Sequence, residues 1–178
     1  MWTITTQETT RLPANDRSIR VLRTRVLHGP NRWSRLPIVH LRVDLGALEQ
    51  LPTNLIAGFG ERLLASLPGL ANHACSTGLP GGFVGRMAEG TWLGHVVEHA
   101  ALELQRAAGG EPTRGKTRAA GPDGIYDIVF AFDDEAVGRA AGAAAVDLVN
   151  GLVDGDRPVT EAAEQTVRTL RALADSRR

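Results

Sequence analysis

Hydrophobic and polar residues alternate along several stretches of the chain, a pattern typical of half-buried β-strands. The clearest stretch is residues 37–45, PIVHLRVDL. One face of this strand would carry Val39, Leu41, Val43 and Leu45, and the other Ile38, His40, Arg42 and Asp44. Residues 19–27, IRVLRTRVL, and 125–132, IYDIVFAF, are rich in β-branched and aromatic residues. The pattern therefore predicts three strands.

Apolar residues recur at helical spacing in four other segments. Helices are predicted over residues 56–67, 91–108 and 135–150, with Thr91 and either Asp133 or Asp134 as N-caps. A last amphipathic helix follows the polar linker DGDRP. Its apolar stripe consists of Val159, Ala162, Ala163, Val167, Leu170 and Leu173. Glycine-rich segments at residues 73–90 and 110–124 are interpreted as loops.

Strands that do not alternate regularly with helices favour an α+β fold over a doubly wound parallel sheet. We predict a mainly antiparallel sheet of three or four strands, with helices packed on one face and an additional C-terminal helix. The predicted division is a flexible leader over residues 1–18, a domain over 19–155 and the C-terminal helix over 156–178. The two predicted loops would form the rim of a cleft.

Composition narrows the class of protein. The 178 residues have a formal net charge of zero, which argues against a general nucleic-acid binder. Cys75 is the one cysteine, so a disulfide framework is excluded and a reducing compartment is favoured. The N-terminus lacks the features of a signal peptide, and no apolar run reaches membrane-spanning length. We therefore expect a cytoplasmic protein without a membrane partner.

The strongest chemical signal is the sequence HVVEH at residues 95–99. His95 and His99 are four residues apart, so they lie on one face of a helix, with Glu98 beside them. This is the H-x-x-E-H order of inverted zincins, in which two imidazoles bind zinc and the glutamate activates water. A pair of structural histidines that fix the helix to the sheet is the alternative.

A catalytic zinc needs a third protein ligand. The candidates are Glu135, Asp134, Cys75 and His73. We favour Glu135 because it begins a helix directly after a strand.

Residues 110–117, GEPTRGKT, match the phosphate-binding pattern G-x-x-x-x-G-K-[ST]. A functional P-loop follows a strand and opens a helix, but here a helix precedes the pattern and glycines follow it. We therefore expect no ATP site, and interpret Arg114, Lys116 and Arg118 as a small anion-binding patch. Trp33 and Trp92 are expected in the core.

Six segments in the same order resemble the N-terminal domain of cyanophycin synthetases. They are LHGPNRWS (27–34), LRVDLGALEQLPTN (41–54), GFGERLLASLPGL (58–70), HACSTGLPGGF (73–83), EGTWLGHVVEHAALELQ (89–105) and GIYDIVFAFDDEAVGRAA (124–141). The resemblance covers about residues 20–155.

The resemblance implies a role with cyanophycin, a polymer with a poly-aspartate backbone and arginine on each side chain. In these enzymes ATP-grasp and Mur-ligase-like domains perform the ligation. These 178 residues contain neither domain, so we do not expect ligase activity from this chain alone. The N-terminal domain is thought to hold the polymer near the ligase sites. In some members it resembles a zinc metallopeptidase that cuts cyanophycin to create primers.

Carried over to this chain, the resemblance makes His95 and His99 zinc ligands and Glu98 the general base. The predicted substrate-binding residues are Arg118, Lys116, His73, Cys75 and Arg139. The chain departs from the family pattern at Ala119 and Ala131, where acidic residues are common, and Lys116 replaces an arginine.

Two functions follow as hypotheses. The first is a zinc-dependent hydrolase acting on cyanophycin or arginyl-aspartate oligomers. The second is a non-catalytic module that binds the polymer or docks ligase domains. A P-loop nucleotide binder is a third hypothesis, with less support from the sequence.

Overall fold

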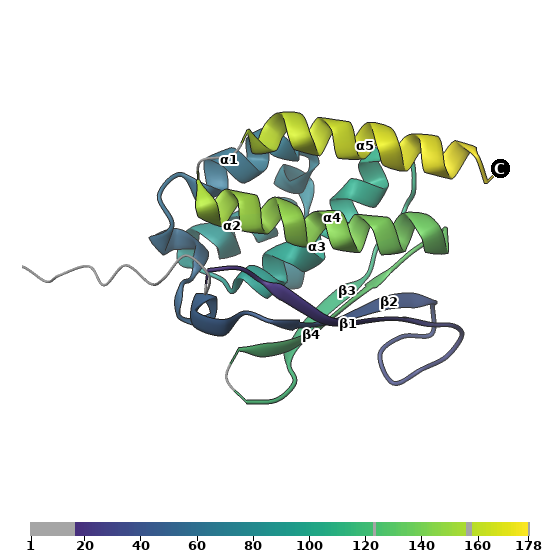
Figure 1. The fold of residues 1–178 in the computed structure, drawn as a ribbon, viewed down its shortest axis with the longest axis horizontal. Coiled ribbons are helices and arrows are strands. Elements are labelled where there is room, and N and C mark those ends of the chain that lie inside the picture. The colour runs from purple at the N-terminus through teal and green to yellow at the C-terminus, as the bar shows by residue number, and fades with distance from the viewer. Residues whose placement is uncertain (1–16, 123, 156–157, 178) are drawn as a thin grey trace, which may run out of the picture.

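A four-stranded antiparallel sheet forms one layer of the molecule (Figure 1). The structure, a computed structural model, describes residues 17–122, 124–155 and 158–177. The strand order is β1-β2-β4-β3. The strands are β1 (Arg20–Leu27), β2 (Ile38–Asp44), β3 (Gly115–Ala119) and β4 (Ile125–Ala131).

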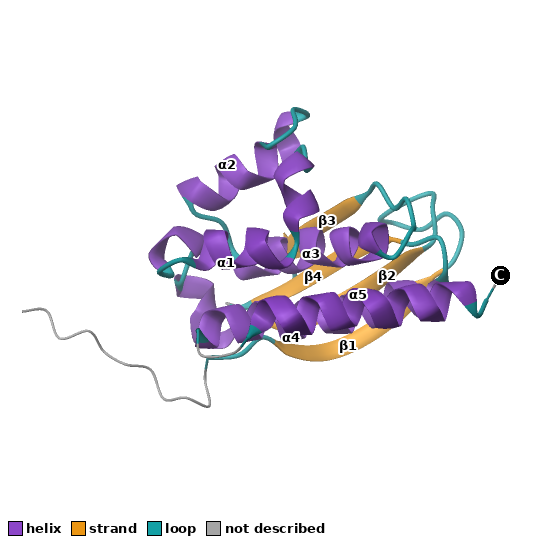
Figure 2. Cartoon of the chain, turned by 90° about the horizontal axis from the view of Figure 1, so that it is seen from above, coloured by secondary structure: helices purple, strands orange, loops and turns teal. Residues whose placement is uncertain are grey.

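Five helices lie on one side of this sheet (Figures 1 and 2). They are α1 (Phe59–Ser66), α2 (Gly82–Glu89), α3 (Leu93–Ala107), α4 (Glu135–Asp154) and α5 (Val159–Asp175). Helices α3 and α4 contact the strands, whereas α5 packs on α1 and α4. The predicted α+β fold, with helices on one face and a C-terminal helix, is confirmed.

The core lies between the sheet and the helices. Val39, Leu41 and Val43 of β2 are at most 1% exposed, as their alternation with polar residues predicts. Their cross-strand partners on β4 are Phe130, Ile128 and Tyr126, which are also buried. Burial of such side chains contributes about 1.5–3 kcal/mol each, so this layer fixes α3 against the sheet.

The opposite face of the sheet carries polar side chains beside the buried Ile38 and Val129. His40 and Arg42 of β2 both bond the carboxylate of Asp127 on β4, at 2.7 Å and 2.9 Å. In register with these residues, Lys116 and Arg118 of β3 lie opposite Val129 and Asp127. Directly opposed residues share a face, so these two cations belong to the outer face of the sheet.

Two predicted loops contain regular structure. Residues 110–124 include β3, and residues 73–90 include α2. The sequence of β3 lacks the alternation of apolar and polar residues that predicts a strand. It forms a strand by pairing with β4. Helix α2 is eight residues long and begins after Gly81, whose left-handed backbone (φ 82°) reverses the chain.

The helix caps are partly as predicted. Asp134 caps α4 by accepting a bond from the Val137 amide at 3.0 Å. Thr91 does not cap α3; the N-cap is Trp92, and the Thr91 hydroxyl contacts the His95 ring instead. Trp92 is 49% exposed, so its prediction as a core residue is wrong.

Residues 1–16 of the predicted leader lie outside the described residues. Among the described residues, α4 is the one helix long and apolar enough to cross a membrane. More than half of its apolar window is buried against the rest of the protein, as expected for a core helix.

Candidate metal centre

Helix α3 presents His95 and His99 on one face. The two residues are one helical turn apart, and their ring centroids are 4.8 Å from each other. His99 is buried and His95 is partly buried. Phe83 of α2 stacks on the His99 ring with a centroid separation of 4.1 Å and an interplanar angle of 20°. This contact fixes the plane in which His99 can offer a ligand atom.

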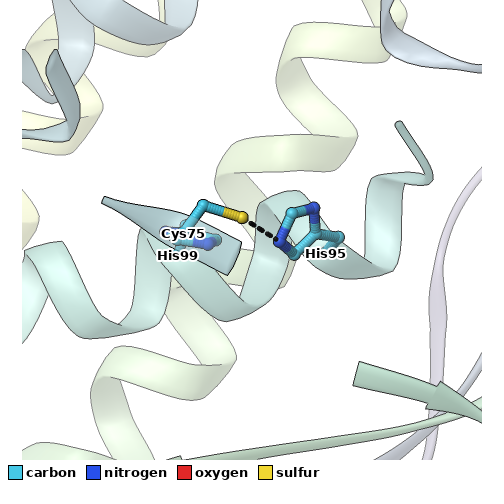
Figure 3. Close-up of side chains that lie close together, drawn as sticks. All are labelled: Cys75, His95 and His99. Carbon is cyan, nitrogen blue, oxygen red and sulfur yellow. Dashed lines mark hydrogen bonds between the residues drawn. The ribbon is translucent and has the colours of Figure 1, made fainter. Parts of the chain in front are cut away.

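Cys75 completes a three-residue cluster with these histidines (Figure 3). Its Sγ lies 3.3 Å from Nε2 of His95. One ligand atom from each of the three residues lies within 4.8 Å of the other two, so the cluster can hold a metal ion. Cys75 has a φ of 53°, which is uncommon for a residue other than glycine. Such backbone strain persists where the surroundings hold it, and here it aims the thiol at α3.

The outer partners of His99 determine which of its nitrogens faces the cluster. Nδ1 of His99 lies 2.9 Å from Nδ1 of His73, and Nε2 of His73 lies 2.9 Å from the Glu103 carboxylate. A carboxylate only accepts, so a neutral His73 donates its Nε2 proton to Glu103 and accepts at Nδ1. His99 then carries its proton on Nδ1 and keeps the Nε2 lone pair for a metal.

His95 is oriented in the same way. Its Nδ1 lies 3.0 Å from the Thr91 hydroxyl, which leaves Nε2 directed at Cys75. Both histidines are thus prepared as Nε2 ligands by a partner on the other nitrogen.

Glu98 lies beside the cluster in a buried position. It is 6% exposed, and its Oε2 accepts a 2.6 Å hydrogen bond from the Thr117 hydroxyl of β3. Burial raises the pKa of Glu98 to about 7, although the bond from Thr117 acts in the opposite direction. A carboxyl group with a pKa near neutrality suits general acid–base work, because it can both take and return a proton.

A cavity of about 820 Å³ connects these groups to solvent. Its wall includes the cluster, Glu98 and residues 112–119. The cations in the wall are Arg86, Arg106, Arg114, Lys116 and Arg118, whereas Glu98 is its one carboxylate among the described residues. The exposed Trp92 also lines the cavity. Sequence reasoning missed Trp92, Thr117 and Glu103, since each acquires its place only through packing.

The predicted site residues separate into two groups. The structure brings His73, Cys75, His95, Glu98 and His99 together. Lys116 and Arg118 line the cavity as part of β3, but their side chains belong to the outer face of the sheet, opposite to Thr117, which bonds Glu98.

Glu135 and Arg139 lie elsewhere. Their side chains bond each other at 2.9 Å, and Glu135 also contacts His28 at 3.5 Å. Neither residue lines the cavity. Asp134, another candidate ligand, caps α4 and pairs with Arg177. The structure therefore places Cys75, and not Glu135, beside the two histidines.

The P-loop pattern also takes a different form. Residues 110–114 lead into β3, so Gly115, Lys116 and Thr117 lie in a strand and not at the start of a helix. The amides of this segment consequently lack the helix N-terminus that binds phosphate in a P-loop.

The chain is similar to known proteins of one family. The profile of the cyanophycin synthase-like N-terminal domain matches residues 40–154, more than half of the chain. The chain belongs to this family. Cyanophycin synthetase of Synechocystis sp. is 46% identical over 158 residues, which are 87% of this chain and 18% of the relative.

Other members are similar to the same degree. Cyanophycin synthetase of Trichormus variabilis is 44% identical over 157 residues, 87% of this chain and 17% of the relative. That of Geminocystis herdmanii is 45% identical over 137 residues, 76% of this chain and 16% of the relative. The chain thus spans less than a fifth of the length of these relatives.

Ala119 and Ala131, where the resemblance implies acidic residues, occupy different places. Ala119 lies on β3 in the cavity wall, and its side chain is exposed. Ala131 is buried at the end of β4, and its carbonyl accepts a bond from Gln105. Neither residue belongs to the Cys75–His95–His99 cluster, so the cluster is complete without an acid at either position.

The pKa values of His95 and His99 predict that the stability of the metal-free protein depends on pH. Burial lowers the pKa of His95 to about 4, and the charge of Arg86 adds to this shift. Burial also lowers the pKa of His99 to about 3, with a further contribution from His95 and His73. The folded state therefore binds fewer protons than the unfolded state between pH 6.5 and 4, and stability falls as pH falls through this range.

Urea unfolding at a series of pH values checks this. Below pH 6, we expect the free energy of unfolding to fall less steeply with pH in His95→Gln than in wild type. The difference should be on the order of 1 kcal/mol per pH unit. His28→Gln, at a histidine with a 71% exposed side chain, is the control. The expectation would be contradicted if the free energy of unfolding changed equally with pH in wild type, His95→Gln and His28→Gln.

Proposed function

We propose that this domain is a zinc-dependent hydrolase that cuts the backbone of cyanophycin, so that the fragments serve as primers. The observation that carries the proposal is the placement of Cys75, His95 and His99 around one point, next to the buried Glu98. Three protein ligands, an open side and an adjacent carboxylate are the requirements of a catalytic zinc site.

The donor set suits zinc. A thiolate and two neutral imidazoles favour zinc over magnesium or calcium, which prefer oxygen ligands. The low pKa values of both histidines keep them neutral, and therefore able to coordinate, at physiological pH. The cavity leaves the solvent side of the cluster open to a substrate.

Glu98 would act as the proton carrier. A bound zinc ion supplies Lewis acidity that polarises a substrate carbonyl. Thr117 holds Oε2 of Glu98, which leaves Oε1 to accept a proton from the attacking water and pass it to the leaving nitrogen. Gly115 provides the space for this carboxylate, because a Cβ there would lie 2.6 Å from it.

The substrate assignment comes from the family and from the cavity wall. The relatives are named cyanophycin synthetases. The basic residues in the wall, Arg86 and Arg106, would bind the carboxylates of the polymer. The exposed Trp92 would stack on its guanidinium groups. Such polymer or oligomer partners, and a cytoplasmic location, fit the single cysteine and neutral charge.

A non-catalytic module that binds the polymer or docks ligase domains is the second candidate. The observation that favours it is the basic outer face of the sheet. Arg23 and Arg25 of β1 pair with Arg42 and His40, and continue the row that includes Arg118. This surface is separate from the metal centre and needs no chemistry to bind carboxylates.

Incubation with purified cyanophycin distinguishes the two. Zinc-loaded protein and chelator-treated protein are each mixed with the polymer, and the products are read by mass spectrometry. We expect short arginyl-aspartate oligomers from the zinc-loaded protein alone. Polymer that sediments with the protein but stays intact in both samples would favour the binding module.

The His73–Glu103 pair gives a further prediction. Glu103→Met removes the acceptor that orients His73, so the His99 proton can move to Nε2, the nitrogen needed for coordination. We expect zinc affinity to fall roughly 10–100-fold, as measured by chelator competition. Nitrogen NMR shifts of the metal-free protein would show His99 losing its Nδ1–H form. Glu61→Gln, on α1 and outside the cavity wall, is the control. Unchanged affinity and tautomer would contradict the role.

A further inference from the structure

Strand β3 has an outer edge to which no strand of the described residues pairs. Its hydrogen-bonding pattern follows from two bonds that flank it. The Ala131 amide donates to the Arg114 carbonyl, and the Ala120 amide donates to the Ile125 carbonyl. In an antiparallel ladder every second residue bonds its partner strand. Lys116 and Arg118 therefore bond β4.

The intervening residues have the opposite orientation. The backbone N–H and C=O groups of Gly115, Thr117 and Ala119 point to the outer edge of β3. In the described part of the chain, no backbone bond to these groups occurs outside the sheet. A row of unpaired groups of this kind is a template for an added strand.

This edge borders the candidate metal centre. Thr117, whose backbone faces outward, has its side chain on Glu98 at 2.6 Å. Gly115 is so close to Glu98 that a Cβ there would lie 2.6 Å from the carboxylate. All five residues of β3 line the 820 Å³ cavity. A chain paired to this edge at the usual strand spacing of about 4.8 Å would pass along the cavity.

Charge indicates the kind of chain. Among the described residues that line the cavity, Arg86 of α2 and Arg106 of α3 are cations and Glu98 is the one carboxylate. Lys116 and Arg118 add positive charge on the outer face of the same strand. Electrostatic complementarity therefore favours a partner that presents carboxylates along its chain.

We infer that the outer edge of β3 binds the main chain of an extended polypeptide with carboxylate-bearing side chains as an additional strand. The bonds to Gly115, Thr117 and Ala119 would hold successive peptide groups beside Glu98. This inference rests on the proposed function, because it names how the same cavity takes its polymer. It also means that the backbone amide, and not a side-chain amide, is presented to the centre.

Amide hydrogen exchange, followed by NMR, tests the inference directly. The probe is a short oligo-aspartate, acetylated and amidated, added to metal-free protein so that nothing is cut. We expect the Gly115, Thr117 and Ala119 amides to gain about ten-fold protection or more. The Lys116 and Arg118 amides, already bonded to β4, should not change. Binding without protection at the three outward amides, or no preference over oligo-asparagine, would overturn the inference.

A substitution gives a second readout. Ala119→Pro removes one outward N–H but no bond to β4, a position where an edge strand tolerates proline. We expect oligo-aspartate to bind about five-fold more weakly, the cost of one hydrogen bond. Ala119→Val keeps the N–H and should weaken binding less than Ala119→Pro does. Equal binding by both variants would overturn the inference, and the exchange experiment on wild type decides it if the proline variant does not fold.

The two proposals fail separately. Edge protection without cleavage of cyanophycin by zinc-loaded protein would overturn the hydrolase and leave the docking edge. Cleavage without protection of the outward amides would overturn the binding edge of β3 and leave the hydrolase.

Discussion

Glu98→Gln is expected to stop cleavage of cyanophycin while the protein still binds one zinc ion. The glutamine keeps the volume and the hydrogen bond with Thr117 but cannot accept a proton from water. General base catalysis contributes about 10²–10⁴-fold, so the rate should fall by that factor. Product release measured by mass spectrometry, together with zinc content by atomic absorption, checks both parts.

Glu89→Gln is the matched control for this experiment. Its carboxylate is exposed at the end of α2 and pairs loosely with Arg86 at 3.8 Å. The control should cut the polymer like wild type. A Glu98→Gln protein that cuts at the wild-type rate would remove Glu98 from the mechanism, and one that loses zinc would make it a ligand.

Cys75→Ser is expected to have the largest effect on zinc affinity. The hydroxyl is a far poorer zinc ligand than a thiolate, because it stays protonated near neutrality. Loss of an outer-shell partner costs roughly 10–100-fold, and loss of a direct ligand should cost more. Chelator competition at constant pH measures the change.

Ser76→Ala is the control at the neighbouring position. Ser76 is exposed and lines the same cavity, but it is not part of the cluster. Its affinity for zinc should fall far less than that of Cys75→Ser, because the Ser76 hydroxyl only contacts Sγ of Cys75, at 3.9 Å. If Cys75→Ser binds zinc as tightly as Ser76→Ala, the metal lies elsewhere or is held without the thiol.

The sequence is sufficient to predict those parts of the fold that have local periodicity. Alternation in β2 and the helical spacing of His95 and His99 each depend on one segment, and both are visible in the chain. The same reasoning found β4, α4 and α5. Asp134 marks the start of α4 as predicted, whereas α4 ends at Asp154 and not at residue 150. Apolar spacing is a short-range signal and held in these elements, but the predicted Thr91 cap of α3 gave way to a contact with His95.

Contacts between distant segments could not be predicted in this way. Cys75 is twenty residues before His95, and its left-handed backbone has no signature in a non-glycine residue. Position after a strand favours Glu135 as a ligand, but in the structure Glu135 pairs with Arg139 and contacts His28 outside the cavity lining. Sequence spacing gives no strand order or loop path, so it could not favour Cys75 over Glu135 as the third member of the cluster.

Zinc K-edge X-ray absorption on the protein loaded with one equivalent of zinc reports the ligands of the metal directly. We expect one sulfur at about 2.3 Å and two imidazole nitrogens at about 2.0–2.1 Å. The sulfur shell should vanish in Cys75→Ser. A spectrum with no sulfur in the wild-type protein, or with no imidazole scattering, would contradict a centre built from Cys75, His95 and His99.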